Sequence, residues 1–569
     1  MKNMKRTIWI ITCCLVAQLT SAQTPKWVEK ARKAVFSIVT YDKENKIKGT
    51  GNGFYIDEQG TALSDYSLFE GANRAVIINA DGKQKDVLTI HGANSMYDII
   101  KFRTSMDKKQ TILNVAPQPA KVGELVYLLP YSTQKSTIPQ TGRITAVDSI
   151  GNDSFYYTIE MKTGAKTISC PIMNANGEVL GMIQKNASDE STESYAIGAG
   201  YGEALSITAF SMNDGSLNNI GIKKGLPDTE EQALVFLFMM STQDIDNETY
   251  LTLLNDFIQL YPNNPEGYIR RANYYMGSKN TDEQALGEED LKKSLEVATN
   301  KEDAKYQAAK AIYSYVISLE GKEGYKEWTL DRALNLIRES IQTKEEGVYL
   351  QLEGDILFAQ GNYAEAYTVY QKVNKTPIAS AATYYSATKA KQMTEGTDIN
   401  EVLALMDSTI AQLKKPYLSE AAPYFYERAS LHVEAGKFRN AVMDYNTFYE
   451  ATSGNVSALF YFQREQAAMQ CRMYQQALDD INKAVEMAPE EADYWVEKGS
   501  VHLRVNQLDE AVSAFNKALT INDKYAAAYR MLGYCQTLQK KKKEACANFA
   551  KAKELGDEVV DSLIEKYCK

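Results

Sequence analysis

The sequence predicts two structural classes in one chain, an all-β region followed by an all-α array of repeats. Between Ala34 and Phe210, short runs of β-branched and aromatic residues are separated by Gly, Asp and Asn, which is typical of a barrel or sandwich. From about residue 229 onward, small and aromatic residues recur every 34 residues with helical spacing, which indicates stacked helix pairs. A chain of 569 residues is also too long for one core, so two or more domains are expected.

The β-type runs are short and occur throughout residues 27–212, which we take as the first domain. They include Val35–Thr40, Phe54–Ile56, Val76–Ile78, Ile99–Phe102, Leu125–Leu129 and Val179–Ile183. Residues 213–228 are polar and contain several glycines, with Pro227 near their end, and we expect them to form a linker.

Several blocks of this first region occur in the order and spacing of a known family. They are Gly49–Asp57, Ala62–Ala72, Tyr97–Phe102, Val122–Tyr127, Thr141–Ile144, Pro171–Asn174 and Gly177–Gly181. In this order they resemble the HtrA/DegP-type branch of the trypsin-like serine proteases. The resemblance implies a chymotrypsin-like double β-barrel.

The resemblance also implies where a catalytic triad would lie, and two of its three members are replaced. The His position is Ser67, the Asp position is Asp98, and the nucleophile position is Ile168. Triad chemistry needs a Ser that attacks, a His that takes its proton and an Asp that orients the His. The family's glycines around the nucleophile are replaced as well, so the oxyanion loop is also altered. We therefore expect no catalytic residues here.

A rearranged triad is the alternative interpretation. Ser169 or Cys170 would then be a shifted nucleophile, and His91, the only histidine of the domain, would be its base. His91 lies seven residues before Asp98, where the family has no catalytic residue. His432 and His502 occupy the same position in two repeats, which favours helix packing over catalysis.

The repeats match the tetratricopeptide pattern, in which each unit is two antiparallel helices. Counted from the first residue of a unit, Gly499 and Gly533 occupy position 8, and Ala511 and Ala545 occupy position 20. Upstream units drift further from the pattern. We assign residues 229–556 to eight or nine repeats, and residues 557–569 to a helix that caps the array.

In such an array, positions 2, 5, 9 and 12 of each first helix are expected to face a concave groove. The larger side chains there in the last four units, with Arg504 beside them, are Tyr426, Val433, Leu459, Phe462, Met469, Val496, Leu503, Arg530 and Tyr534. The set is aromatic and aliphatic, which favours an apolar or mixed peptide segment over an acidic tail. The alternative is that these side chains pack between neighbouring units.

The N-terminus has the pattern of a secretory signal. Lys2, Lys5 and Arg6 precede a short apolar run, and small residues end at Ala22, where we expect cleavage. A lipoprotein anchor at Cys13 or Cys14 is the alternative. No later stretch is long and apolar enough for a transmembrane helix.

Charge and cysteine usage restrict the remaining possibilities. Removing the signal takes the net charge from −10 to −13, which argues against a nucleic-acid partner. Five cysteines remain, and their spacing leaves the pairing open. With three histidines in the chain and no Cys/His cluster, we expect no metal and no cofactor.

The sequence thus predicts an exported, non-catalytic protein-binding or scaffold protein, periplasmic or secreted. Its repeats would bind a protein or peptide, and its trypsin-like domain would serve as a platform. The alternative is an active serine-type endopeptidase whose repeats recruit substrate. The oligomeric state is left open.

Overall fold

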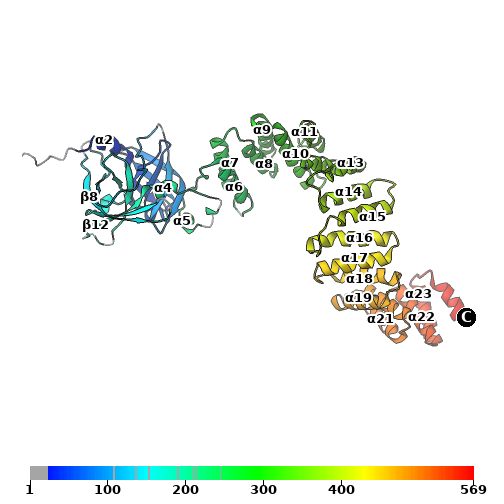
Figure 1. Cartoon of the computed structure of the whole chain (residues 1–569). Coiled ribbons are helices and arrows are strands. Elements are labelled where there is room, and N and C mark those ends of the chain that lie inside the picture. The colour runs from blue at the N-terminus through cyan, green and yellow to red at the C-terminus, as the bar shows by residue number, and fades with distance from the viewer. Residues whose placement is uncertain are drawn as a thin grey trace, which may run out of the picture. The chain divides into compact units, whose positions relative to one another are not determined.

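A computed structural model describes residues 24–569, except residues 107–108, 135–136, 152–153, 187, 189–190, 209, 212–213 and 244. The expected signal segment, residues 1–22, lies outside the described residues. The chain divides into two compact units, of which the first runs to Tyr275 and includes Lys292–Val297. The second comprises Met276–Leu291 and Ala298–Lys569. Figure 1 shows the order of the elements along the chain.

The first unit opens with a short helix, α2 (Val28–Ala31), and a 3₁₀ turn, η1 (Arg32–Ala34), and continues into a closed antiparallel barrel. Its strands are β1 (Val35–Tyr41), β2 (Ile47–Tyr55), β3 (Thr61–Ser64), β4 (Arg74–Ile78), β5 (Gln84–Asn94) and β6 (Ile99–Thr104). The order around the barrel is β1-β2-β3-β6-β5-β4, and β1 closes it by pairing with β4, for example Val39 with Val76. Large apolar side chains such as Phe36, Phe54 and Phe102 fill the interior and are 0% exposed.

A second closed barrel repeats this topology. Its strands are β7 (Leu125–Leu128), β8 (Gln140–Ser149), β9 (Phe155–Glu160), β10 (Pro171–Met173), β11 (Val179–Ile183) and β12 (Glu193–Gly198). Read from β7, the order is β7-β8-β9-β12-β11-β10, which matches the first barrel strand for strand. The predicted all-β double barrel is therefore confirmed.

The segment that follows the second barrel packs against the first one. After α4 (Ala199–Ala204) and α5 (Gly215–Asn218), the buried side chains of Leu217, Ile220 and Ile222 belong to the same apolar core as strands β1–β6. The expected linker region thus contains a short helix and several core residues. The chain then enters α6 (Glu230–Ser241) and α7 (Asn247–Leu260), whose first turns are capped by the side chains of Thr229 and Asp246.

The remaining chain is helical. The helices are α8 (Pro265–Met276), α9 (Thr281–Val297), α10 (Lys301–Ser318), α11 (Leu330–Thr343), α12 (Gly347–Ala359), α13 (Tyr363–Val373), α14 (Ala381–Met393), α15 (Ile399–Ile410), α16 (Ala422–Glu434), α17 (Phe438–Ala451), α18 (Ala458–Gln470), α19 (Tyr474–Met487), α20 (Ala492–Arg504), α21 (Leu508–Ile521), α22 (Ala526–Leu538), α23 (Lys542–Glu554) and α24 (Val560–Tyr567). None of the described helices combines the length and apolar character needed to cross a membrane.

Small residues at position 8 let the two helices of a unit approach closely. A Cβ added at Gly499 would lie 2.6 Å from the ring of Phe515, and one at Gly533 would lie 2.8 Å from Phe549. Both rings occupy position 24 and are 0% exposed. The glycine therefore makes room for an aromatic ring of the second helix, and this pairing fixes the packing of the unit.

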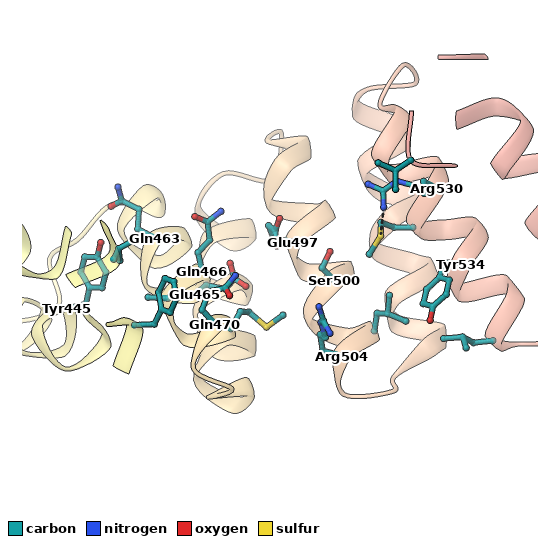
Figure 2. A pocket seen from close by; sticks show the side chains of 18 of the residues that line it. Tyr445, Gln463, Glu465, Gln466, Gln470, Glu497, Ser500, Arg504, Arg530 and Tyr534 are labelled. Carbon is teal, nitrogen blue, oxygen red and sulfur yellow. Dashed lines mark hydrogen bonds between the residues drawn. The ribbon is translucent and has the colours of Figure 1, made fainter. Parts of the chain in front are cut away.

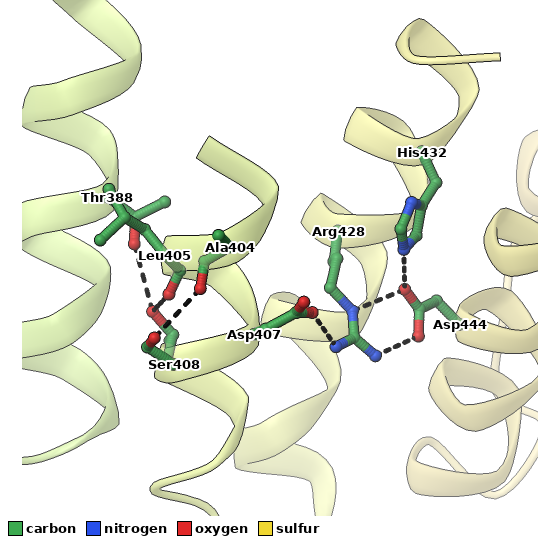
Figure 3. Close-up of polar contacts among 9 residues, drawn as sticks. Thr388, Ala404, Leu405, Asp407, Ser408, Arg428, His432 and Asp444 are labelled. Carbon is green, nitrogen blue, oxygen red and sulfur yellow. Dashed lines mark hydrogen bonds and ion pairs between the residues drawn. The ribbon is translucent and has the colours of Figure 1, made fainter. Parts of the chain in front are cut away.

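Several buried charged groups in the array are paired. Figure 3 shows the Arg428 guanidinium between Asp407, at 2.7 Å, and Asp444, to which it donates two hydrogen bonds of 2.8 and 2.6 Å. His432 lies 3.7 Å from the same Asp444 carboxylate, and burial lowers the pKa of its imidazole. These contacts are consistent with a structural role for His432.

The last helix, α24, is covalently attached to the array. A disulfide joins Cys546 on α23 to Cys568, the residue after α24, and the side chain of Val560 is fully buried against α23. Cys170, Cys471 and Cys535 are free thiols. The disulfide gives the pairing that the cysteine spacing left open, and it holds α24 on the end of the array.

Candidate functional site

The structure brings the triad-equivalent residues Ser67 and Asp98 into contact. The Ser67 backbone N–H donates to Asp98 Oδ1 at 2.7 Å, and its Oγ lies 3.1 Å from Asp98 Oδ2. Burial raises the pKa of the Asp98 carboxyl; the hydrogen bonds from Ser67 oppose this effect, and the nearby Asp65 reinforces it. A serine hydroxyl has no basicity near neutral pH, so Ser67 cannot replace the imidazole as a general base.

Asp65, which the sequence reasoning missed, connects Ser67 to the loop at the nucleophile position. Its carboxylate accepts hydrogen bonds from the Ser169 hydroxyl and, at 3.2 Å, from the Ser67 hydroxyl. A chain of alternating hydroxyls and carboxylates therefore runs from Ser169 through Asp65 and Ser67 to Asp98. It links the two barrels, because Ser67 and Asp65 belong to the first and Ser169 to the second.

The loop at the nucleophile position is held by the side chain of Asn52 on β2. Its amide donates to the carbonyls of Ile168, at 2.8 Å, and Lys166, at 3.1 Å. The backbone N–H of Ser169 donates to Ile183, and that of Cys170 donates to Thr167. If Ser169 or Cys170 were a shifted nucleophile, its own backbone N–H would therefore not be free to meet a developing negative charge in an oxyanion hole.

The residues of a shifted triad are not brought together. Cys170 is fully buried, and burial raises the pKa of its thiol to about 12, so the reactive thiolate is suppressed near neutral pH. His91 is hydrogen-bonded to Thr89 at 2.9 Å and lies 3.9 Å from Asp228. Burial lowers its pKa to about 4. Neither contact of His91 leads toward Ser169 or Cys170.

A groove of about 1110 Å³ lies in the helical unit, along the first helices of successive repeats. Figure 2 shows labelled side chains along it from α18, α20 and α22. Where the first helices of the repeats line the groove, most of the lining residues occupy positions 6, 9, 12 and 13. These residues are Ser430, Val433, Gln463, Gln466, Met469, Gln470, Glu497, Ser500, Leu503, Arg504, Met531, Tyr534 and Leu538. Positions 6, 9 and 13 share one helical face, since they are three and seven residues apart.

Of the ten side chains that our prediction placed at the groove, six line it: Val433, Met469, Leu503, Arg504, Arg530 and Tyr534. Leu459 is 51% exposed and is not part of the lining, and the other three are packed against neighbouring side chains. Tyr426 packs against Tyr445 and Phe448, and the Phe462 ring lies 4.8 Å from that of Tyr494. Val496 is a core residue with 7% exposure.

Glu465 is a second residue that sequence reasoning missed, and it lines the same groove. Its side chain is 0% exposed, and neither carboxylate oxygen has a hydrogen-bond partner in the described structure. Burial raises its pKa to about 8, and the negative charges of Glu497 and Asp480 add to this effect. Glu497, half-buried on α20, also has a raised pKa because of burial.

The sequence did contain a signal for Glu465. It occupies position 8 of its unit, where neighbouring units have Ala429, Gly499 and Gly533. A long acidic side chain at a position that otherwise selects the smallest residues contradicts the local pattern, and such conflicts are typical of functional sites. Among the described residues, no group of three His, Cys, Asp or Glu side chains is placed to hold a metal ion.

Comparison with known proteins identifies the repeat class. Residues 466–526 match a family model described as tetratricopeptide repeat. A stretch of 101 residues is 26% identical to the small glutamine-rich tetratricopeptide repeat-containing protein 2 of Saccharomyces cerevisiae, covering 18% of this chain and 29% of that protein. Residues 466–526 are thus similar to tetratricopeptide repeats, and the helix pairs on either side of them form an array of the same type.

A similar solved structure is the crystal structure of the Rv3671c protease in its inactive form. The similarity covers 31% of this chain and 88% of that chain, at 20% identity and a TM-score of 0.26.

Proposed function

We propose that this chain is an exported protein-binding protein whose repeat groove holds a peptide segment of a partner, while its double-barrel domain is a non-catalytic platform. The groove supports the proposal most directly. Its volume of about 1110 Å³ suits a short helix or extended segment, and Met469, Leu503 and Tyr534 offer apolar contacts beside polar groups.

The contacts at the triad positions support a non-catalytic platform. Ser67 stands where a base is needed, Ile168 stands where a nucleophile is needed, and the hydroxyl of the buried Ser169 is engaged in a hydrogen bond to Asp65. Together these features remove the base and the nucleophile, both of which acyl transfer by a triad requires.

A pair of variants tests the groove. The full-length protein and its Leu503→Arg variant are each immobilised, and proteins retained from an envelope extract are identified and then purified for direct binding. We expect one partner that binds the wild type and is lost in Leu503→Arg, while Glu510→Gln, an exposed change outside the groove, retains it. Equal retention by all three proteins would contradict the groove as the binding site.

Two further measurements test the platform and the export. We expect no labelling of the protein by a reactive-serine probe; labelling that disappears in Ser169→Ala would favour the endopeptidase alternative. We also expect a mature N-terminus at Gln23, and the Cys546–Cys568 disulfide agrees with an oxidising compartment. Mass spectrometry that finds an acylated Cys13 or Cys14 would contradict this processing.

A further inference from the structure

We propose that Glu465 and Glu497 make the groove selective for a partner segment that presents a lysine side chain between apolar residues. The inference deepens the proposed function and depends on it, since it names the chemistry that the same groove selects. Three observations carry it: an unpartnered buried carboxylate, a second carboxylate on the next repeat, and apolar walls around them.

The first observation is that Glu465 lacks a partner within the chain. Both its carboxylate oxygens are buried without a hydrogen bond, which is costly whether the group is charged or neutral. The neighbouring Arg464 does not compensate Glu465, because its guanidinium donates two hydrogen bonds, of 2.9 and 2.6 Å, to Asp480 and a third, of 3.0 Å, to Asn446. A cation from a bound partner would supply the charge and the hydrogen bonds that the Glu465 carboxylate lacks within the chain.

The second observation is that the charges lining the groove leave this acidic pair uncompensated. Arg530 is engaged by Asp557 at 2.7 Å. Arg504 lies seven residues after Glu497 on α20, which is about 10 Å along a helix. The half-buried Glu497 is the carboxylate that a ligand meets at the surface of the groove, and the fully buried Glu465 is a second carboxyl that ionises when a cation is placed beside it.

The third observation is the character of the walls, which favours lysine over other cations. Met469 and Leu503 line the groove on the two helices that bear the glutamates, so a four-carbon stem packs against them while its ammonium meets the carboxylates. Within the described part of the chain, no third His, Cys, Asp or Glu side chain joins this pair in a group that could hold a metal ion.

Binding of a lysine also changes the protonation of Glu465. With a pKa of about 8, this carboxyl is mostly protonated at pH 7 in the free protein. The charged groups facing it are Glu497 on α20 and Asp480 on α19, and Asp480 is paired with Arg464, which lies beside Glu465 on α18. An ammonium placed beside the pair favours the ionised form, so binding releases a proton.

Peptide pools provide the test on the full-length protein. Two pools of fluorescent twelve-residue peptides, capped at both ends, carry lysine or norleucine at the centre and mixtures of Leu, Ala, Ser and Gln elsewhere. By fluorescence anisotropy we expect the lysine pool to bind about tenfold tighter or more, as charge-assisted hydrogen bonds allow. In Glu465→Gln and Glu497→Gln we expect that ratio to fall to within about twofold, and in Glu510→Gln to persist. Circular dichroism verifies that each variant is folded.

Calorimetry adds a readout that a merely structural glutamate would not change. In buffers of different ionisation enthalpy at pH 7, we expect close to one proton released per lysine peptide by the wild type and none by Glu465→Gln. A lysine preference that persists in the Glu465→Gln/Glu497→Gln double variant would overturn the inference.

The outcomes separate the two proposals. If both pools bind equally and Leu503→Arg abolishes both interactions, the groove is a peptide site and the lysine inference is wrong. If neither pool binds at millimolar concentration, the groove proposal and the lysine inference are both wrong.

Discussion

Replacing Glu465 by Gln should remove a pH-dependent destabilisation of the repeats around it. The folded-state pKa of this carboxyl is about 8 and its ordinary value is 4.5, so the folded protein holds a proton that the unfolded chain releases in that interval. Stability is therefore full below pH 4.5 and falls as pH rises toward 8. The slope is about 1.4 kcal/mol per pH unit.

This slope sets the size of the expected effect. Between pH 5.5 and 8 the wild type should lose about 3 kcal/mol of local stability that Glu465→Gln retains, or roughly 100-fold in the opening constant. Glu497 and Asp480 share the local field, so part of the change reports their coupled titration. Only the change of local stability with pH is attributed to the carboxyl. Any pH-independent difference in stability between Glu and Gln at this position cancels in that comparison.

Hydrogen exchange followed by mass spectrometry is the suitable assay, because repeat arrays need not unfold in a single step. The protection of α18 and α20 is compared between wild type and variant in identical buffers at each pH. Glu510→Gln, with the same charge change on the exposed side of α21, should follow the wild type. Parallel pH profiles for wild type and Glu465→Gln would show that this carboxyl titrates normally, and the reasoning about its burial would fail.

Four further outcomes are expected. The purified protein should hydrolyse neither casein nor peptides, and Ser169→Ala should behave identically; turnover that this substitution abolishes would revive the shifted nucleophile. Tyr534→Ala should weaken peptide binding by about 1–2 kcal/mol with little change in melting temperature. Phe462→Ala should instead lower the free energy of unfolding by about 2 kcal/mol without weakening peptide binding, since its ring packs on the next repeat. Fluorescence anisotropy measures the binding of each variant and thermal melts measure its stability. If Tyr534→Ala lost stability and Phe462→Ala lost binding, the groove assignment would be contradicted. Cys568→Ser should cost about 3 kcal/mol of α24 docking, as expected for a loop closed over 22 residues, and unchanged exchange in α24 would show that packing alone holds it.

The architecture was accessible from the sequence because its determinants are local or periodic. The glycine at position 8 and the ring at position 24 are 16 residues apart, as in Gly499 and Phe515, and they meet within one helix pair. The strands of the barrels followed from short apolar runs bounded by turn residues. The resemblance then gave the double barrel, which composition alone would have left as a barrel or a sandwich.

The contacts at the triad positions could be predicted only in part. The resemblance to the trypsin-like proteases placed Ser67 and Asp98 in one site, and the structure has them in contact. Asp65 was missed because its significance depends on Ser169, which lies 104 residues away along the chain. A sequence pattern cannot reveal that a carboxylate reaches from one barrel to the loop of another.

For some residues, the prediction assigned the wrong side of the helix to the groove. Our prediction used positions 2, 5, 9 and 12, whereas the lining is richest at 6, 9, 12 and 13. A shift by one residue rotates a side chain by about 100° around a helix, enough to move position 5 from the groove to the contact between repeats. Val496 at position 5 is accordingly in the core, while Glu497 beside it lines the groove.

Glu465 is tolerated because a second position in the same unit departs from the pattern. Position 24 holds Phe515 and Phe549 in the last two units, and there the rings fill the space that glycine leaves. In the unit of Glu465 that position is Ile481, which is smaller and leaves volume for a longer side chain on the first helix. Volume alone would be satisfied equally well by leucine or methionine, without a buried carboxylate. The smaller residue at position 24 thus explains why a large side chain fits at position 8 of this unit. It does not explain why that side chain is acidic, whereas a bound cation would.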